Sequence, residues 1–171
     1  NGTEQGDKSS IGMIFAKEPP KTEVRTPAVA QQLFAIPPNA EHHQVVSKTT
    51  FSKDAILYSM FPHMHLRGKS FEYGIVYPDG RKESLLSVPK YDFNWQTYYI
   101  YAKPLAVPKG ARLEATAHYD NSVANPWNPD PRATVRWGEQ TWEEMQYTGI
   151  TYSLDKEPIQ PSPATARKAQ Q

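Results

Sequence analysis

Two histidines separated by one residue, His63 and His65, are the side chains of this sequence with the clearest capacity to bind a metal ion. In a β-strand, residues i and i+2 point to the same face, so both imidazoles can reach one ion. The apolar stripe that we expect on the core side of this strand consists of Ile56, Tyr58, Met60, Met64 and Leu66. The two histidines then occupy the opposite face. The alternative is a pair of ordinary surface histidines, because His-x-His alone is a weak signal.

A third histidine, His118, lies in a predicted strand over 112–119 whose even positions are polar and whose odd positions are apolar. This alternation places it on a polar face, where it could meet the other two across the sheet. The alternative is a histidine that bonds a neighbouring strand or loop. We interpret His42 and His43 as solvated loop residues, because adjacent side chains of an extended chain point to opposite faces.

One loop with three prolines gathers five side chains that carry oxygen ligands: Asp120, Asn121, Asn125, Asn128 and Asp130. Such a density of oxygen atoms could hold Ca²⁺. The same residues form Asx-turns more often, and we favour turns over a calcium site. Glu143-Glu144 offers a carboxylate, but no second acid at a glycosidase-like spacing accompanies it.

The composition of the chain excludes several classes of protein and of site. The chain has 171 residues and a formal net charge of +1, which argues against a nucleic-acid partner because such proteins need a strongly basic face. It contains no cysteine, so thiolate nucleophiles, iron–sulfur clusters and blue-copper thiolates are excluded. Any metal must be held by His, Met or oxygen ligands. No apolar run approaches the ~18 residues of a membrane span.

The elements that position these residues are predicted to be strands. The 16 prolines and 9 glycines fall between short apolar runs, which is typical of an all-β domain. We therefore expect an antiparallel β-sandwich or jelly roll of about nine strands. The predicted strands are 11–16, 44–51, 55–61, 70–77, 82–88, 96–102, 112–119, 133–137 and 145–153.

Two turns and two chain ends complete the expected organisation. Pro78-Asp79-Gly80 is predicted to close a hairpin, and Pro108-Lys109-Gly110 is predicted to form a similar turn. Residues 1–10 form a polar leader without a core pattern, and residues 154–171 have almost nothing to bury and are predicted to be a flexible tail.

Three segments, 57–73, 116–131 and 135–145, together resemble the C-terminal domain of copper type II, ascorbate-dependent monooxygenases. That family includes peptidylglycine α-hydroxylating monooxygenase and dopamine β-monooxygenase, and the likeness is closest to bacterial relatives over residues 11–153. The resemblance implies one copper ion, the site of O₂ activation, bound by His63, His65 and Met145. A thioether is a soft ligand that favours Cu(I). His118 has no ligand counterpart in the family and stays a candidate fourth ligand or a partner of the ligands.

The resemblance also implies partners. The full enzymes have a further β-domain whose three-His copper delivers the second electron, and this sequence begins with what resembles the last strands of that domain. We therefore expect an upstream domain, subunit or redox partner, and a periplasmic or extracellular location. Whether the chain acts alone as an oxidoreductase stays open. The alternative function is a non-catalytic structural or interaction subunit of a complex, with Trp95, Tyr98 and Trp127 among its aromatic anchors.

Overall fold

The structure is a computed structural model that describes residues 2–154. The predicted tail over 154–171 therefore lies outside the described residues except for Leu154. Described residues 2–23 belong to one unit, and residues 24–154 belong to a second unit that carries all the strands. Within residues 2–154, there is no helix with the length and apolar character needed to cross a membrane.

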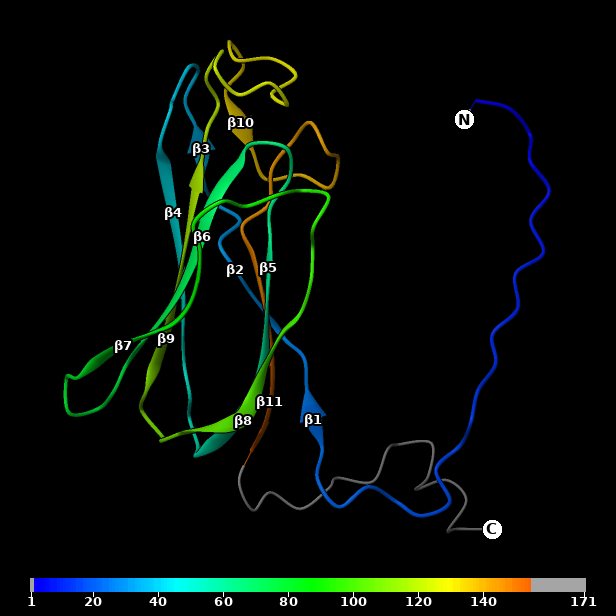
Figure 1. The fold of residues 1–171 in the computed structure, drawn as a ribbon, viewed down its shortest axis with the longest axis vertical. Coiled ribbons are helices and arrows are strands. Elements are labelled where there is room, and N and C mark those ends of the chain that lie inside the picture. The colour runs from blue at the N-terminus through cyan, green and yellow to red at the C-terminus, as the bar shows by residue number, and fades with distance from the viewer. Residues whose placement is uncertain (1, 155–171) are drawn as a thin grey trace. The chain divides into compact units, whose positions relative to one another are not determined.

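The second unit is an all-β structure of eleven strands (Figure 1). They are β1 (Val24–Arg25), β2 (Ala28–Ala30), β3 (Ala35–Ile36), β4 (His43–Thr50), β5 (Ala55–His63), β6 (Gly68–Val76), β7 (Lys82–Val88), β8 (Tyr99–Val107), β9 (Arg112–Tyr119), β10 (Val135–Arg136) and β11 (Tyr147–Leu154). One sheet, called here the β5 sheet, has the order β1-β11-β5-β8, with β2 beside β11. The other, the β9 sheet, has the order β4-β9-β6-β7, and β3 pairs separately with β10. The predicted antiparallel sandwich is confirmed.

The two sheets pack face to face around one apolar core (Figure 1). Leu57 and Ile150 contribute to it from the β5 sheet, and Phe71 and Leu113 contribute from the β9 sheet. Burial alternates residue by residue along β9, as the sequence pattern predicts for a strand with one face on a core. The opposite faces of both sheets are therefore the ones available for binding.

Most strand predictions are confirmed, and one is wrong. Residues 11–16 form no strand, and their large apolar side chains are exposed. The strand predicted over 96–102 starts later, at Tyr99, and continues to Val107. The segment 28–34, for which no strand was predicted, contributes the short β2.

Both predicted turns are present. One joins two strands of the same sheet, and the other joins strands of different sheets. At Pro78–Gly80 the amide of Gly80 donates to Tyr77 O at 2.9 Å, and β6 pairs with β7 as a hairpin. Gly80 has φ +85° and Gly110 has φ +86°, a conformation that glycine adopts without steric cost. The turn at Pro108–Gly110 joins β8 to β9, which belong to different sheets, so it carries the chain across the sandwich.

A β-bulge at Tyr58 determines which way the end of β5 faces. Tyr58 has no register partner in either neighbouring strand, since both ladders pass from Leu57 directly to Ser59. Before the bulge Leu57 lies in the core, and after it Met60 does. The extra residue changes the phase of the alternation, so His63 at the end of the strand lies on the outer face.

The apolar stripe predicted along this strand is therefore only half correct. Met60 and Met64 are buried as expected. Ile56, Tyr58 and Leu66 are only half-buried, and the core position between Ile56 and Tyr58 belongs to Leu57. A single extra residue interrupts the period of two, and simple alternation does not reveal such an insertion.

Candidate metal centre

The structure brings His63 and His65 together with a geometry that suits one metal ion. Their ring centroids lie 5.1 Å apart and their planes are nearly perpendicular, at 83°. Two imidazoles bound at about 2.0–2.1 Å to a tetrahedral ion would have centroids roughly 5 Å apart. A ring separation of this size is shared by two imidazoles on one ion and by an ordinary edge-to-face ring contact.

Hydrogen bonds fix the tautomer of His63. The Nε2 of Gln96 donates to the carbonyl of Phe93 at 2.8 Å, which turns Oε1 of the same amide toward the imidazole. That oxygen faces His63 Nδ1 and can only accept, so Nδ1 carries the hydrogen. The lone pair is then on Nε2, the atom that a metal binds.

The tautomer of His65 is fixed in the same way, by a different hydrogen-bond acceptor. Its Nδ1 lies 3.2 Å from the backbone carbonyl of Glu143, which can only accept, so Nδ1 is again the protonated nitrogen. Burial lowers the pKa of His65, more than the carbonyls of Glu143 and Gln140 raise it, and His63 lowers it further. A lowered pKa keeps the ring neutral near pH 7, which is the form that coordinates metal.

Met145 lies directly beside this pair along the backbone. The β5–β11 ladder ends at Tyr147 and His63. Beyond it, the backbone amides of His65 and Met145 both donate to Glu144 Oε2, at 2.8 Å and 3.3 Å. Gln146 and Thr148 are fully buried, so Met145 and Tyr147 alternate to the other face. The ring of Tyr147 meets that of His63 edge-on at 6.0 Å, which confirms the outer face for that position.

Glu144 joins the two halves of the site, a role that the sequence did not reveal. Its carboxylate is fully buried, and it accepts the backbone N–H groups of His65 at 2.8 Å and Arg67 at 2.7 Å. The amide of Met145 also donates to it, at 3.3 Å. Burial raises the pKa of Glu144 to about 7, although the donors of His65 and Arg67 lower it. One carboxylate thus ties the His63–His65 segment to the Met145 segment.

A buried arginine extends this anchoring to the neighbouring loop. Arg67 is 1% exposed; its Nε donates to Asn121 Oδ1 at 2.8 Å, and its guanidinium also donates to the Trp142 carbonyl. Asn121 is fully buried and donates to the carbonyls of Pro37 and Ala133. Neither residue was predicted to matter to the histidine pair, because their contacts exist only in the folded chain.

The oxygen-rich loop forms the Asx-turns that we favoured. The side-chain oxygens of Asp120, Asn125 and Asp130 accept the backbone amides of the residues two positions later, at 2.9–3.0 Å. Asn128 donates to Asn121 Oδ1 at 3.1 Å, so that oxygen also has internal partners. These oxygens thus serve the loop itself, whereas the buried Oδ1 of Asn128 has no hydrogen-bond partner among residues 2–154.

His118 lies outside this centre. It is on β9 of the other sheet, with its alternate neighbours Ala117 and Tyr119 in the core, so its side chain points away from the β5 sheet. Its ring stacks on His42 at 4.2 Å, and its Nδ1 lies 3.2 Å from Ser70 Oγ. The structure therefore does not bring His118 to the pair as a fourth ligand. His42 is an exposed loop residue as predicted, whereas His43 is the first residue of β4 and is half-buried.

Among residues 2–154 there is no cluster of three or more His, Cys, Asp or Glu side chains arranged for a metal. A metal at His63 and His65 consequently requires a further ligand of another kind, and a thioether is one such kind. The backbone amide of Met145 shares the acceptor Glu144 Oε2 with that of His65, so its backbone lies near the pair.

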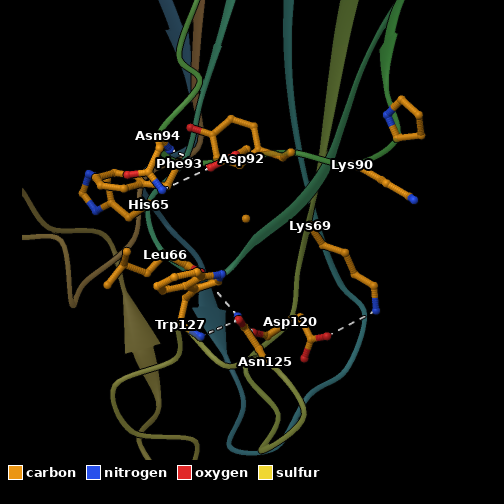
Figure 2. A pocket seen from close by; sticks show the side chains of 13 residues that line it. His65, Leu66, Lys69, Lys90, Asp92, Phe93, Asn94, Asp120, Asn125 and Trp127 are labelled. Atoms are coloured by element: carbon orange, nitrogen blue, oxygen red, sulfur yellow. Dashed lines mark hydrogen bonds and ion pairs between the residues drawn. The ribbon is translucent and has the colours of Figure 1, made fainter.

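One flank of the site opens into a cleft of about 930 Å³ (Figure 2). His65 and Phe93 lie at one end of it, with their rings edge to face at 6.2 Å. Trp127 lines the cleft near Leu66, and Lys90 lies at the far side from His65 (Figure 2). A molecule in this cleft would therefore lie directly beside a candidate metal ligand.

No known family model matches the chain, and no curated protein matches it either. Among solved structures, the infectious bursal disease virus Gx strain is similar at 10% identity and a TM-score of 0.35, over 88% of this chain and 46% of that chain. The VP2 subviral particle of infectious bursal disease virus is similar at 11% identity and a TM-score of 0.35, over 85% and 43%. The chain spans less than half the length of these viral chains. At this level of similarity they carry no conclusion about its function.

Proposed function

We propose that this chain is a copper-binding β-sandwich related to the O₂-activating half of type II copper monooxygenases. The observation that carries the proposal is the His63–His65 pair, whose rings lie 5.1 Å apart with both Nδ1 atoms facing protein acceptors. This arrangement leaves the two metal-binding lone pairs on the Nε2 atoms.

The proposed ligands are His63, His65 and Met145, for one copper ion. Copper in such a site supplies one-electron redox chemistry and a place for dioxygen, while the thioether favours Cu(I). The protein's own contribution is positional: Gln96 and the Glu143 carbonyl hold the two rings, and Glu144 holds both ligand segments in place. Such partners are a recognised means of orienting metal ligands.

The chemistry implies an external electron donor. Hydroxylation of a C–H bond by O₂ consumes two electrons and two protons and yields an alcohol and water. One copper ion passing from Cu(I) to Cu(II) provides only one of these electrons. We therefore propose that a redox partner, upstream domain or subunit provides the other, in a periplasmic or extracellular setting as the family resemblance implies.

A titration with Cu(I) tests the proposal. We expect about one equivalent to bind, and we expect His63→Ala and Met145→Ala to lose or weaken that binding. His118→Ala is the matched control, since this histidine lies on the other sheet and stacks on His42. A protein that takes up no copper at micromolar concentration, or that loses it only in His118→Ala, overturns the proposal.

A second candidate function, a non-catalytic interaction subunit, has one observation in its favour. Trp95, Tyr98 and Ile100 are large apolar side chains exposed at and before the start of β8, which lies at an edge of the β5 sheet. Exposed aromatic residues anchor protein interfaces. This function predicts that a stable partner copurifies equally well with the wild type and with His63→Ala, and that Trp95→Ala releases it.

A further inference from the structure

We infer that the cleft beside His65 binds an aromatic carboxylate, with its ring against Trp127 and Phe93 and its carboxylate at Lys90. This inference names a substrate class for the copper centre and so rests on the proposed function for its catalytic meaning. The binding site itself is independent of any metal.

The apolar walls of the cleft are suited to a flat ring. Leu66, Pro89, Phe93 and Trp127 line it, and Trp127 is 68% exposed. In Figure 2 the indole of Trp127 lies across the cleft from Asp92 and close to Leu66. Aromatic side chains bind aromatic ligands by offset stacking or edge-to-face contact. The exposed indole of Trp127 therefore offers a surface on which a bound aromatic ring would stack.

The loop holds Trp127 in place without burying it. The amide of Trp127 donates to Asn125 Oδ1 at 3.0 Å, and Asn125 Nδ2 donates to the carbonyls of Asp120 and Leu66. Asn128, on the other side, donates to Asn121 and to the Ser122 carbonyl. A backbone fixed on both sides of an exposed tryptophan reduces the entropy lost when a ligand stacks on it.

Two side chains pack closely on Gly68, which lines the cleft. A Cβ at this position would lie 2.6 Å from Tyr91 Cδ1 and 2.9 Å from Met64 Cβ. Tyr91 also lines the cleft, and its hydroxyl bonds both the amide and the carbonyl of Met64. This wall of the cleft is therefore held by hydrogen bonds to the backbone.

The cleft is lined by Lys69 and Lys90 and by Asp92 and Asp120, and Lys90 is the cation that we assign to a ligand anion. Lys69 is paired with Asp120 at 3.4 Å, and Asp92 accepts the amide of Asn94 at 2.8 Å. Among the charged side chains that line the cleft, that of Lys90 is the one without a hydrogen bond or ion pair to residues 2–154. It lies across the cleft from the His65 end (Figure 2). A ligand carboxylate at Lys90 would consequently place the apolar part of the molecule toward His65.

The test uses the full metal-free protein and three probes: 4-phenylbutyrate, its neutral analogue 4-phenylbutan-1-ol, and the non-aromatic 4-cyclohexylbutyrate. Binding is followed by NMR chemical-shift changes. The variants are Lys90→Gln and Trp127→Ala. Lys103→Gln and Trp142→Ala are matched controls, since both side chains are exposed and neither lines the cleft.

We expect 4-phenylbutyrate to bind more tightly than the other two probes and to shift cleft resonances. Lys90→Gln should weaken its binding about two- to fivefold, as for an exposed ion pair, without affecting the alcohol. Trp127→Ala should weaken both aromatic probes about two- to tenfold. Both variants change exposed side chains, so their spectra should keep the wild-type fold.

Equal affinity for the acid and the alcohol, or equal effects of Lys90→Gln and Lys103→Gln, overturns the inference. So does an absence of cleft shifts with all three probes. A protein that binds Cu(I) at His63 but shows no such shifts contradicts this inference alone. A protein that shows the shifts but takes up no copper contradicts the proposed function alone.

Discussion

At the scale of single residues, the chemistry of the centre depends on what holds the imidazoles. Both rings direct Nδ1 at an oxygen that can only accept, one from Gln96 and one from the Glu143 backbone. The tautomer is therefore set before any metal arrives. For the proposed copper ion, such fixed rings would reduce the cost of ordering the ligands.

Replacing Gln96 tests this account directly. Gln96→Leu removes the acceptor of His63 Nδ1, and we expect copper affinity to fall about 10- to 100-fold, the usual range for losing a partner of a metal ligand. The fold should be retained, because Gln96 is only half-buried. Gln44→Leu, an exposed glutamine on β4, is the control. Equal copper affinities for the two variants, measured by competition with a Cu(I) chelator, would contradict the positioning role.

Glu144 is the residue whose loss should damage the framework. Glu144→Ala leaves the buried amides of His65 and Arg67 without an acceptor, and we expect the free energy of unfolding to fall by about 2–5 kcal/mol. Glu139→Ala, an exposed neighbour, should stay within about 0.5 kcal/mol of wild type. Urea denaturation measures both, and a Glu144→Ala protein as stable as Glu139→Ala would refute the anchoring role.

The sequence identified the histidine pair at this scale but not its supports. His-x-His is readable because the two residues are only two positions apart in the sequence, although β5 ends at His63 and His65 lies just beyond it. Gln96 and Glu144 come from segments that reach His63 and His65 only after the chain folds. Their amino-acid types are common on protein surfaces, so nothing local marked them.

At the scale of elements, the pairing of β5 with β11 positions the centre. The bulge at Tyr58 sends His63 to the outer face, and the ladder pairs Tyr147 with it. The hairpin at Pro78–Gly80 could be predicted because proline and glycine define it locally. The bulge could not, because an extra residue leaves no mark on a sequence of mixed apolar and polar residues.

Gly149 lets the two strands approach closely at this point. Its register partner is Phe61, and a Cβ at position 149 would lie 2.9 Å from Phe61 Cβ. We expect Gly149→Ala to destabilise the protein by about 1–3 kcal/mol through overpacking and to weaken copper binding by shifting His63. Gly74→Ala is the matched control, because its Cβ would lie at an ordinary 3.6 Å from Glu83 O. Thermal unfolding of both variants should separate them, and equal melting temperatures would count against a tight β5–β11 contact.

At the scale of the whole β-sandwich, a buried polar network joins the two sheets. Gln146, which precedes β11, donates to Ser47 on β4 at 2.8 Å and to Thr148 at 3.1 Å, and its oxygen accepts the Gln31 amide. All-β topology and the sandwich could be predicted from composition and alternation. The order of strands and this bridge could not, because they depend on contacts about 100 residues apart in sequence.

Removing the Gln146 hydrogen bonds should destabilise the β-sandwich next to the candidate metal centre. Gln146→Leu leaves Ser47 and the Gln31 amide without one of their partners, and we expect a loss of about 1–3 kcal/mol in stability. Gln140→Leu, at an exposed position, is the control. Hydrogen exchange of the amides in β4 and β11 should accelerate in the first variant, and unchanged protection there would contradict the role of the bridge.

The most direct test of the central claim is X-ray absorption at the copper edge on the Cu(I)-loaded protein. The account predicts one copper per chain with two imidazole nitrogens and one sulfur, the sulfur absent in Met145→Leu and the copper absent in His63→Ala. A protein that binds no copper, or one whose copper spectrum is the same in both variants as in the wild type, would contradict it.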